Sequence, residues 1–144
     1  MKKLLFSFAF AFVFFALISN NAIAQAIQNS NYSTVGYIKD DGSVQNENYS
    51  TIGYIKDDGT VQNGNYSTIG YIKDDGTIQN SNYMTLGYIK DDGTIQDKNY
   101  YTMGYMKLDG TMQNSNYSTI GYAKDVKNRT YAAAAVFFFF FRLN

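Results

Sequence analysis

The sequence predicts a mainly β fold: a closed, shallow, symmetric antiparallel barrel of repeated hairpins with a hydrophobic C-terminal helix at its centre. Three observations lead to this prediction. A seventeen-residue unit occurs six times within residues 25–126. Each unit holds two strand-like stretches between turn residues. The chain then closes on "YAAAAVFFFFF" and a short polar end. The predicted parts are a leader (1–24), one repeat domain (25–126), and a connector with the helix (127–144).

The leader has the form of a secretory signal peptide. Two lysines precede an apolar stretch, and small residues follow at Ala22 and Ala24. This order predicts cleavage between Ala24 and Gln25. An uncleaved membrane anchor is the alternative, but the apolar stretch is shorter than the about 20 residues that span a bilayer. We therefore expect an exported protein, which is periplasmic, displayed at the cell surface or secreted.

The composition restricts the chemistry. The chain has no cysteine and no histidine, so disulfides, the common nucleophile and base pairs and the usual zinc and redox sites are absent. We expect no enzymatic activity, no metal and no cofactor. Loss of Lys2 and Lys3 with the leader leaves ten basic against twelve acidic residues, without a basic stripe. Nucleic-acid binding is therefore not expected.

The repeats begin at the predicted cleavage site, so the two predictions support each other. The first unit reads "QAIQNSNYSTVGYIKDD" and the third reads "GTVQNGNYSTIGYIKDD". Within a unit, "TIGYIK" is rich in β-branched and aromatic residues, whereas "TVQN" is shorter and half polar. An Asn-rich turn containing a tyrosine joins the two stretches. Each unit therefore predicts two short strands, and residues 127–130 form the connector that follows the repeats.

The "DDG" sequence predicts a three-residue hairpin turn. Asp57 and Asp58 occupy the type I turn, and Gly59 supplies the left-handed conformation. In this register Ile55 lies opposite Val61. The equivalent apolar pairs are Ile38 with Val44, Ile72 with Ile78, Ile89 with Ile95, and Met106 with Met112. We expect the sheet face that carries these pairs to face the core.

The two ends of the repeat region predict closure of the sheet. The units supply about twelve strands, beginning on "IQN" and ending on "TIGYAK", which are complementary halves of one hairpin. Pairing of the first strand with the last removes both sheet edges. An open solenoid is the alternative, but it requires capping units that this sequence does not show.

The apolar C-terminal segment is predicted to fill the ring. Side chains just fill a barrel of about eight strands, so a wider ring needs an occupant. A helix that is apolar all round must be buried on every side. The predicted plug residues are Ala132, Ala133, Ala134, Ala135, Val136, Phe137, Phe138, Phe139, Phe140 and Phe141. A strand is disfavoured by the four alanines, and the segment is too short to span a membrane. An exposed tail that enters a bilayer or binds a partner stays an open alternative.

One glycine in each unit is assigned to the inner face. It lies two residues before the inward Ile, Met or Ala, and alternate residues of a strand share a face. A missing side chain there lets the central helix approach. These glycines are Gly36, Gly53, Gly70, Gly87, Gly104 and Gly121.

Two other recurring residue types have simpler interpretations. Paired aspartates such as Asp57 and Asp58 lack the spacing of calcium loops, so we interpret them as turn formers rather than acid and base or metal ligands. One tyrosine in each "GY" sequence is expected to pack across strands, with sugar binding or a membrane interface as alternatives. These strand tyrosines are Tyr37, Tyr54, Tyr71, Tyr88, Tyr105 and Tyr122.

The repeats, the closing "IGYAKDV" and the terminal "AAAAVFFFFF" resemble the β-flower proteins, exported bacterial proteins also described as 5-fold β-flower proteins. The resemblance covers nearly all of the mature chain. It implies a shallow symmetric barrel of hairpin petals around a hydrophobic C-terminal helix, similar to the tubby-like barrel. It implies no established activity, and the analogy with lipid binding by tubby-like barrels concerns the fold alone. The number of petals stays open between five and six.

Two classes of function follow. The first is an exported, non-catalytic barrel with a structural or binding role. The alternative is a membrane-active or lipid-binding barrel that uses its Phe-rich helix, so membrane or lipid contact stays open. The sequence does not determine a protein partner or an oligomeric state.

Overall fold

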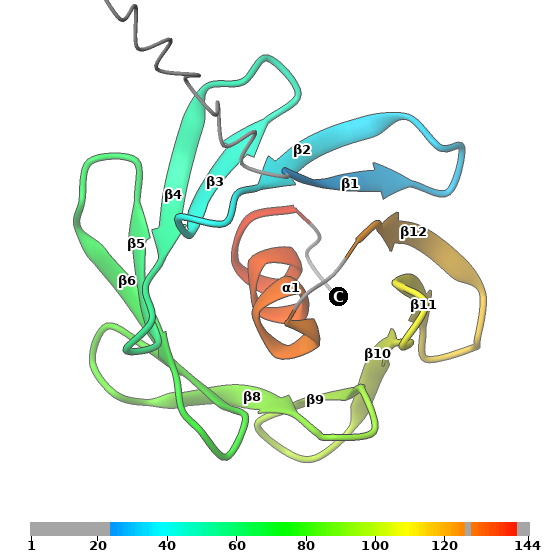
Figure 1. Ribbon diagram of the computed structural model, residues 1–144. Coiled ribbons are helices and arrows are strands. Elements are labelled where there is room, and N and C mark those ends of the chain that lie inside the picture. Colours follow the sequence, from blue (N-terminus) through cyan, green and yellow to red (C-terminus); the bar gives the residue numbers. More distant parts are fainter. Residues whose placement is uncertain (1–23, 126–127, 141–144) are drawn as a thin grey trace, which may run out of the picture.

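The computed structural model describes residues 24–125 and 128–140, and within them it shows a closed antiparallel barrel around a C-terminal helix (Figure 1). This confirms the predicted fold class. The strands are β1 (Gln25–Asn29), β2 (Thr34–Ile38), β3 (Ser43–Asn46), β4 (Thr51–Ile55), β5 (Thr60–Asn63), β6 (Thr68–Ile72), β7 (Thr77–Asn80), β8 (Thr85–Ile89), β9 (Thr94–Asp97), β10 (Thr102–Met106), β11 (Thr111–Asn114) and β12 (Thr119–Ala123).

The ring closes between its first and last strands. Each strand pairs with its neighbours in sequence, and β1 also pairs with β12, which places Ile27 opposite Ala123. No open solenoid forms. Six repeats surround the axis, so the number of petals is six.

The Asp-Asp-Gly turns have the predicted geometry. In the turn between β4 and β5, the Gly59 amide donates to the Lys56 carbonyl at 2.9 Å, and the Lys56 amide donates to the Thr60 carbonyl at 2.9 Å. Gly59 has φ 80°, the left-handed conformation that favours glycine. A Cβ on Gly59 would also collide with the carbonyl oxygen of Ile72, one repeat later. Glycine is therefore required by its own backbone and by the neighbouring hairpin.

The Asn-rich turns lie at the outer ends of the hairpins (Figure 1). Between β3 and β4, the Asn46 side chain accepts hydrogen bonds from the amides of Asn48 and Ser50, both at 3.0 Å. Tyr49 takes the left-handed conformation with φ 62°, which costs an L-residue about 1–2 kcal/mol. All six repeats place a tyrosine there; we call them the turn tyrosines: Tyr32, Tyr49, Tyr66, Tyr83, Tyr100 and Tyr117.

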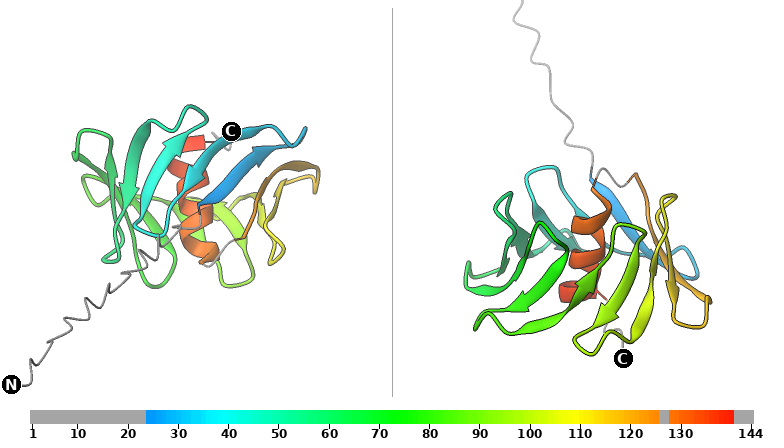
Figure 2. Two further views of the ribbon diagram at one scale, coloured as in Figure 1. Left: turned by 45° about the horizontal axis from the view of Figure 1, so that its top comes forward. Right: turned by 90° about the horizontal axis from the view of Figure 1, so that it is seen from below.

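A bulge in each long strand turns an extra apolar residue toward the core. Val44 lies opposite Gly53 whereas Gln45 lies opposite Thr51, so Ile52 is the additional residue. Bulges bend a strand and increase its twist. The outer turns accordingly spread away from the axis (Figure 2). The half-buried bulge residues that pack against the core include Val35, Ile52, Ile69, Leu86 and Ile120.

The core is one cluster of inward side chains from the strands, packed together with the helix. Ile55 lies opposite Val61, and the other predicted apolar pairs are confirmed in the same register. All of these side chains are at most 6% exposed. The odd-numbered strands contribute Ile27, Val44, Val61, Ile78, Ile95 and Met112, and the even-numbered strands contribute Ile38, Ile55, Ile72, Ile89, Met106 and Ala123.

The C-terminal segment forms two consecutive helical elements, α1 (Arg129–Ala135) and the π-helix η1 (Val136–Phe140). Asn128 caps α1, because its side-chain oxygen accepts from the Tyr131 amide at 3.1 Å. The helix therefore begins inside the segment predicted as a connector. We call α1 and η1 together the plug, which runs along the barrel axis (Figure 2).

Candidate functional site

The plug meets the barrel wall at the repeat glycines. Gly36, Gly53 and Gly70 are buried. A Cβ at Gly70 would lie 2.7 Å from the ring of Phe138, and a Cβ at Gly53 or Gly36 would collide with the rings of Phe139 and Phe140. The missing side chains thus provide the space that these phenyl rings occupy.

Consecutive phenylalanines contact consecutive repeats, in reverse order along the chain. Phe140 meets the first repeat, Phe139 the second and Phe138 the third. Six repeats around one axis are spaced by about 60°, whereas an α-helix turns about 100° per residue. A π-helix is hydrogen-bonded between residues i and i+5 rather than i and i+4, and it therefore turns less per residue. The change from α1 to η1 therefore brings the rotation of the phenyl rings closer to the spacing of the repeats.

The glycines are also required by the neighbouring strand. A Cβ at Gly87 or Gly104 would collide with the carbonyl oxygens of Gln96 and Gln113, respectively. The same clash occurs at Gly36, Gly53 and Gly70 with the equivalent glutamines. The sequence did not indicate this second cause, because it depends on how closely the neighbouring strand approaches. Gly121 is likewise buried and lies opposite Met112.

The middle of the plug is fully enclosed. Ala132, Ala133, Ala134, Ala135 and Val136 are at most 1% exposed. Phe137, Phe138, Phe139 and Phe140 are half-buried and pack against the core. Phe141 lies outside the described residues. In the described part of the chain, no helix has the length and hydropathy of a membrane span.

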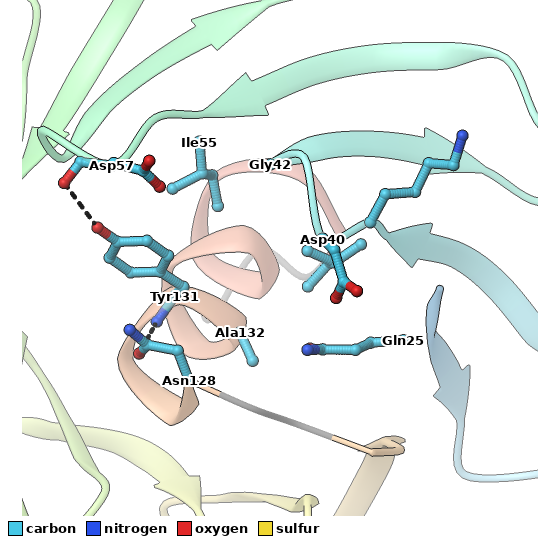
Figure 3. Close-up of a pocket in the computed structure, with 10 residues that line it drawn as sticks. Gln25, Asp40, Gly42, Ile55, Asp57, Asn128, Tyr131 and Ala132 are labelled. Carbon is cyan, nitrogen blue, oxygen red and sulfur yellow. Dashed lines mark hydrogen bonds between the residues drawn. The ribbon is translucent and has the colours of Figure 1, made fainter. Parts of the chain in front are cut away.

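The start of the plug is anchored beside a small cavity at the end of the ring where the Asp-Asp-Gly turns lie. The Tyr131 hydroxyl donates to the Asp57 carbonyl oxygen at 3.1 Å, and the cavity beside it has a volume of about 130 Å³ (Figure 3). Burial, together with the nearby Asp57 carboxylate, raises the pKa of Tyr131. Gln25 and Asp40 also line the cavity. Gln25 is the first residue of β1 and is 8% exposed, and Ala24 directly precedes it. The rest of the predicted leader, 1–23, lies outside the described residues.

The second aspartate of each turn serves the backbone. Asp58 accepts from the Thr60 amide at 2.9 Å, and this hydrogen bond lowers the pKa of Asp58. The equivalent aspartates are Asp41, Asp75, Asp92 and Asp109. In Asp41 the hydroxyl of Ser43 makes the largest contribution to the lowered pKa. Among the described residues, no group of three or more His, Cys, Asp or Glu side chains is placed to hold a metal ion.

Tyrosines form six stacked pairs on the outside of the barrel. The Tyr37 and Tyr49 rings have centroids 4.8 Å apart and an interplanar angle of 13°, and the Tyr37 hydroxyl donates to the Tyr49 hydroxyl at 3.1 Å. That hydrogen bond raises the pKa of Tyr37. The other pairs are Tyr54 with Tyr66, Tyr71 with Tyr83, Tyr88 with Tyr100, Tyr105 with Tyr117, and Tyr122 with Tyr32.

The sequence predicted that the strand tyrosines pack across strands, but it did not indicate the turn tyrosines as their partners. The constant twelve-residue separation of five pairs was the available signal. The sixth pair, Tyr122 with Tyr32, joins residues 90 positions apart and depends on ring closure. The turn tyrosines are 61–66% exposed, so the pairs form an accessible aromatic band.

The model of a family described as "5-fold beta-flower protein" matches residues 24–142. No curated protein and no solved structure matches the chain. The family match confirms the resemblance seen in the sequence. The six repeats of this barrel differ from the five in the family's description.

Proposed function

The chain belongs to the 5-fold β-flower protein family, and from this premise we propose that it is an exported, non-catalytic barrel with a structural or binding role, permanently closed by its own plug. The contact between the plug and the repeat glycines carries the proposal. Three consecutive phenyl rings occupy the positions where three glycines lack side chains. The interior is thus matched to a segment of the same chain.

The energetics support a permanent plug. Release would expose both the plug and the inward Ile, Val and Met side chains of the wall, which are buried together in one cluster. Burial of one large aliphatic side chain contributes about 1.5–3 kcal/mol. The Asn128 cap and the hydrogen bond from Tyr131 to Asp57 also hold the start of the plug. Release of the helix would therefore break many favourable contacts at once.

The position of β1 supports export. The first strand begins at Gln25, directly after the predicted cleavage site. Cleavage between Ala24 and Gln25 leaves all twelve strands of the ring intact. The mature protein then acts through its outside, since its centre is occupied by the plug.

Membrane binding is the alternative, and one observation favours it. Phe137, Phe138, Phe139 and Phe140 are only half-buried. Together with half-buried bulge residues such as Val35 and Ile52, they place apolar side chains toward one end of the barrel. Apolar side chains of this kind favour insertion into the boundary between headgroups and acyl chains.

Flotation with liposomes separates the two functions. The mature protein is mixed with phosphatidylcholine liposomes, with and without anionic phosphatidylglycerol, and centrifuged in a density gradient. A permanently plugged barrel stays in the dense fractions with both compositions. Flotation of the parent, reduced in a folded Phe140→Ser variant but not in Leu108→Ser, would instead establish the membrane-binding alternative. Leu108 suits the control because it is 87% exposed in an Asp-Asp-Gly-type turn.

A further inference from the structure

We propose that the six tyrosine pairs are sites of oxidative cross-linking, at which a one-electron oxidant of the peroxidase class joins each pair as dityrosine. The proposal concerns the outer wall and does not depend on the binding role. It would give a chain without cysteine an alternative to disulfide bonds.

The geometry of the pairs suits ring coupling. In all six pairs the ring centroids are 4.7–4.8 Å apart and the planes differ by 6–15°. The two hydroxyl oxygens are 3.0–3.3 Å apart. Because the hydroxyls of nearly parallel rings meet, the ring carbons ortho to them are neighbours as well. Those carbons are the positions at which two phenoxyl radicals couple.

The chemistry balances with hydrogen peroxide as the terminal oxidant. A haem peroxidase removes one electron from each phenol, and each phenol releases its hydroxyl proton. The two radicals form one carbon–carbon bond between ortho carbons, and each ring then transfers its displaced hydrogen to oxygen to restore the phenol. Two tyrosines thus lose two electrons and two protons, which convert one hydrogen peroxide into two waters. The turn tyrosines are 61–66% exposed and accessible to such an oxidant.

The backbone gives a second indication that these tyrosines have a particular role. Every turn tyrosine has a φ between 61° and 67°, a strained conformation for a bulky residue and one that asparagine or glycine adopts more easily. All six repeats nevertheless place tyrosine there, while the residue two positions earlier varies among Ser, Glu, Gly and Lys and the residue directly before it is Asn in every repeat. Stacking with the strand tyrosine offsets the strain in the reduced protein, and the same stacking presents the pair for coupling.

The pair of Tyr32 with Tyr122 has the largest consequence. Its partners lie 90 positions apart and join the first repeat to the last. A covalent bond there closes the barrel permanently. In the chain-entropy model, a cross-link that closes a long loop restricts the unfolded chain more than one that closes a short loop. This cross-link is therefore expected to raise the melting temperature more than any of the five twelve-residue pairs.

The test treats the purified mature protein with horseradish-type haem peroxidase and a limiting amount of hydrogen peroxide. We expect dityrosine fluorescence, a monomeric band on denaturing gels, and a mass decrease of two hydrogens for each joined pair. Peptide mass spectrometry should identify links between paired tyrosines, including Tyr32 with Tyr122. Tyr101 provides the internal control, because it is 73% exposed and belongs to none of the six pairs.

Two variants sharpen the result. Tyr32→Phe retains a stacked ring but no hydroxyl, so it should lose the link to Tyr122 and the rise in melting temperature while the other five links persist. Tyr101→Phe should cross-link like the parent. Links that involve Tyr101 as often as the paired tyrosines, or links mainly between different molecules, would overturn the proposal. If Tyr32→Phe does not fold, Tyr54→Phe tests the same specificity, since it should lose only its link to Tyr66.

Discussion

The phenyl ring of Phe139 lies directly against the α-carbon of Gly53, at a distance that leaves no room for a methyl group. Neighbouring phenylalanines repeat this contact at Gly36 and Gly70. The inner surface of the barrel is therefore matched to the plug at three consecutive phenylalanines. This match makes the stability of the barrel dependent on both partners.

Replacement of Gly53 by alanine should destabilise the barrel. The new methyl group meets the Phe139 ring and the Gln62 carbonyl oxygen at once, and overpacking of a core costs about 1–3 kcal/mol. We expect a lower midpoint in urea denaturation. Gly64→Ala is the matched control, because Gly64 is exposed and the equivalent positions of other repeats hold Ser30, Glu47 and Lys98. Equal effects of the two substitutions would contradict the contact.

Deletion of residues 131–144 should prevent stable folding. Without the plug, the inward Ile, Val and Met side chains line an empty space. Repacking cannot close that space, because a barrel of twelve strands is too wide to be filled by its own side chains. We expect an unfolded or aggregated protein in circular dichroism and size-exclusion chromatography. A deletion variant that melts at the parent's temperature would show that the plug is dispensable.

Phe139→Asp tests the same interior with a single change. The substitution removes a phenyl ring from its contact with Gly53 and places a carboxylate beside side chains that offer no partner charge. We therefore expect the free energy of unfolding to fall by more than ~3 kcal/mol. Leu108→Asp is the control at an 87% exposed position and should leave the melting temperature nearly unchanged. If both variants melt like the parent, the C-terminal segment is an external tail.

Acid should weaken the barrel through its turns. The amide of Thr60 holds the pKa of Asp58 below its ordinary value, and four equivalent aspartates are shifted in the same direction. The unfolded chain therefore takes up protons at a higher pH than the folded barrel. The stabilisation is present above the ordinary aspartate pKa and is lost as the pH falls through the lowered value.

Urea denaturation between neutral pH and about pH 2 measures this loss. Asp58→Asn keeps an oxygen that accepts from Thr60 but does not titrate, so its stability should fall less steeply in acid than that of the parent. Asp57→Asn is the control, because the hydrogen bond from the Thr60 amide goes to Asp58. A parent-like acid curve for Asp58→Asn would contradict the assignment.

The exported protein should begin at Gln25. Small residues at Ala22 and Ala24 favour cleavage there, and β1 starts at the same residue. Intact-mass spectrometry of the exported fraction determines the new N-terminus. Ala24→Phe should block or move cleavage, whereas Ala24→Ser, which remains small, should be processed normally. An exported parent that retains the apolar leader would disprove the predicted site.

Much of the wall could be predicted because its causes are local. Asp57, Asp58 and Gly59 specify a turn, and the turn places Ile55 opposite Val61 without help from the rest of the chain. Alternation of side chains along a strand then directs Gly53 to the same face as Ile55. Closure was also predictable, since the two ends of the repeat region are complementary strands.

The tertiary structure alone decided what depends on the circumference of the ring. The number of repeats sets the angle between neighbouring glycines, and that angle favours the π-helical turn of Phe138, Phe139 and Phe140 over a continued α-helix. The pairing of Tyr32 with Tyr122 exists only because β1 meets β12. Local sequence determines turns and strand faces, whereas contacts between residues 90 positions apart arise only when the whole sheet has bent into a closed circle.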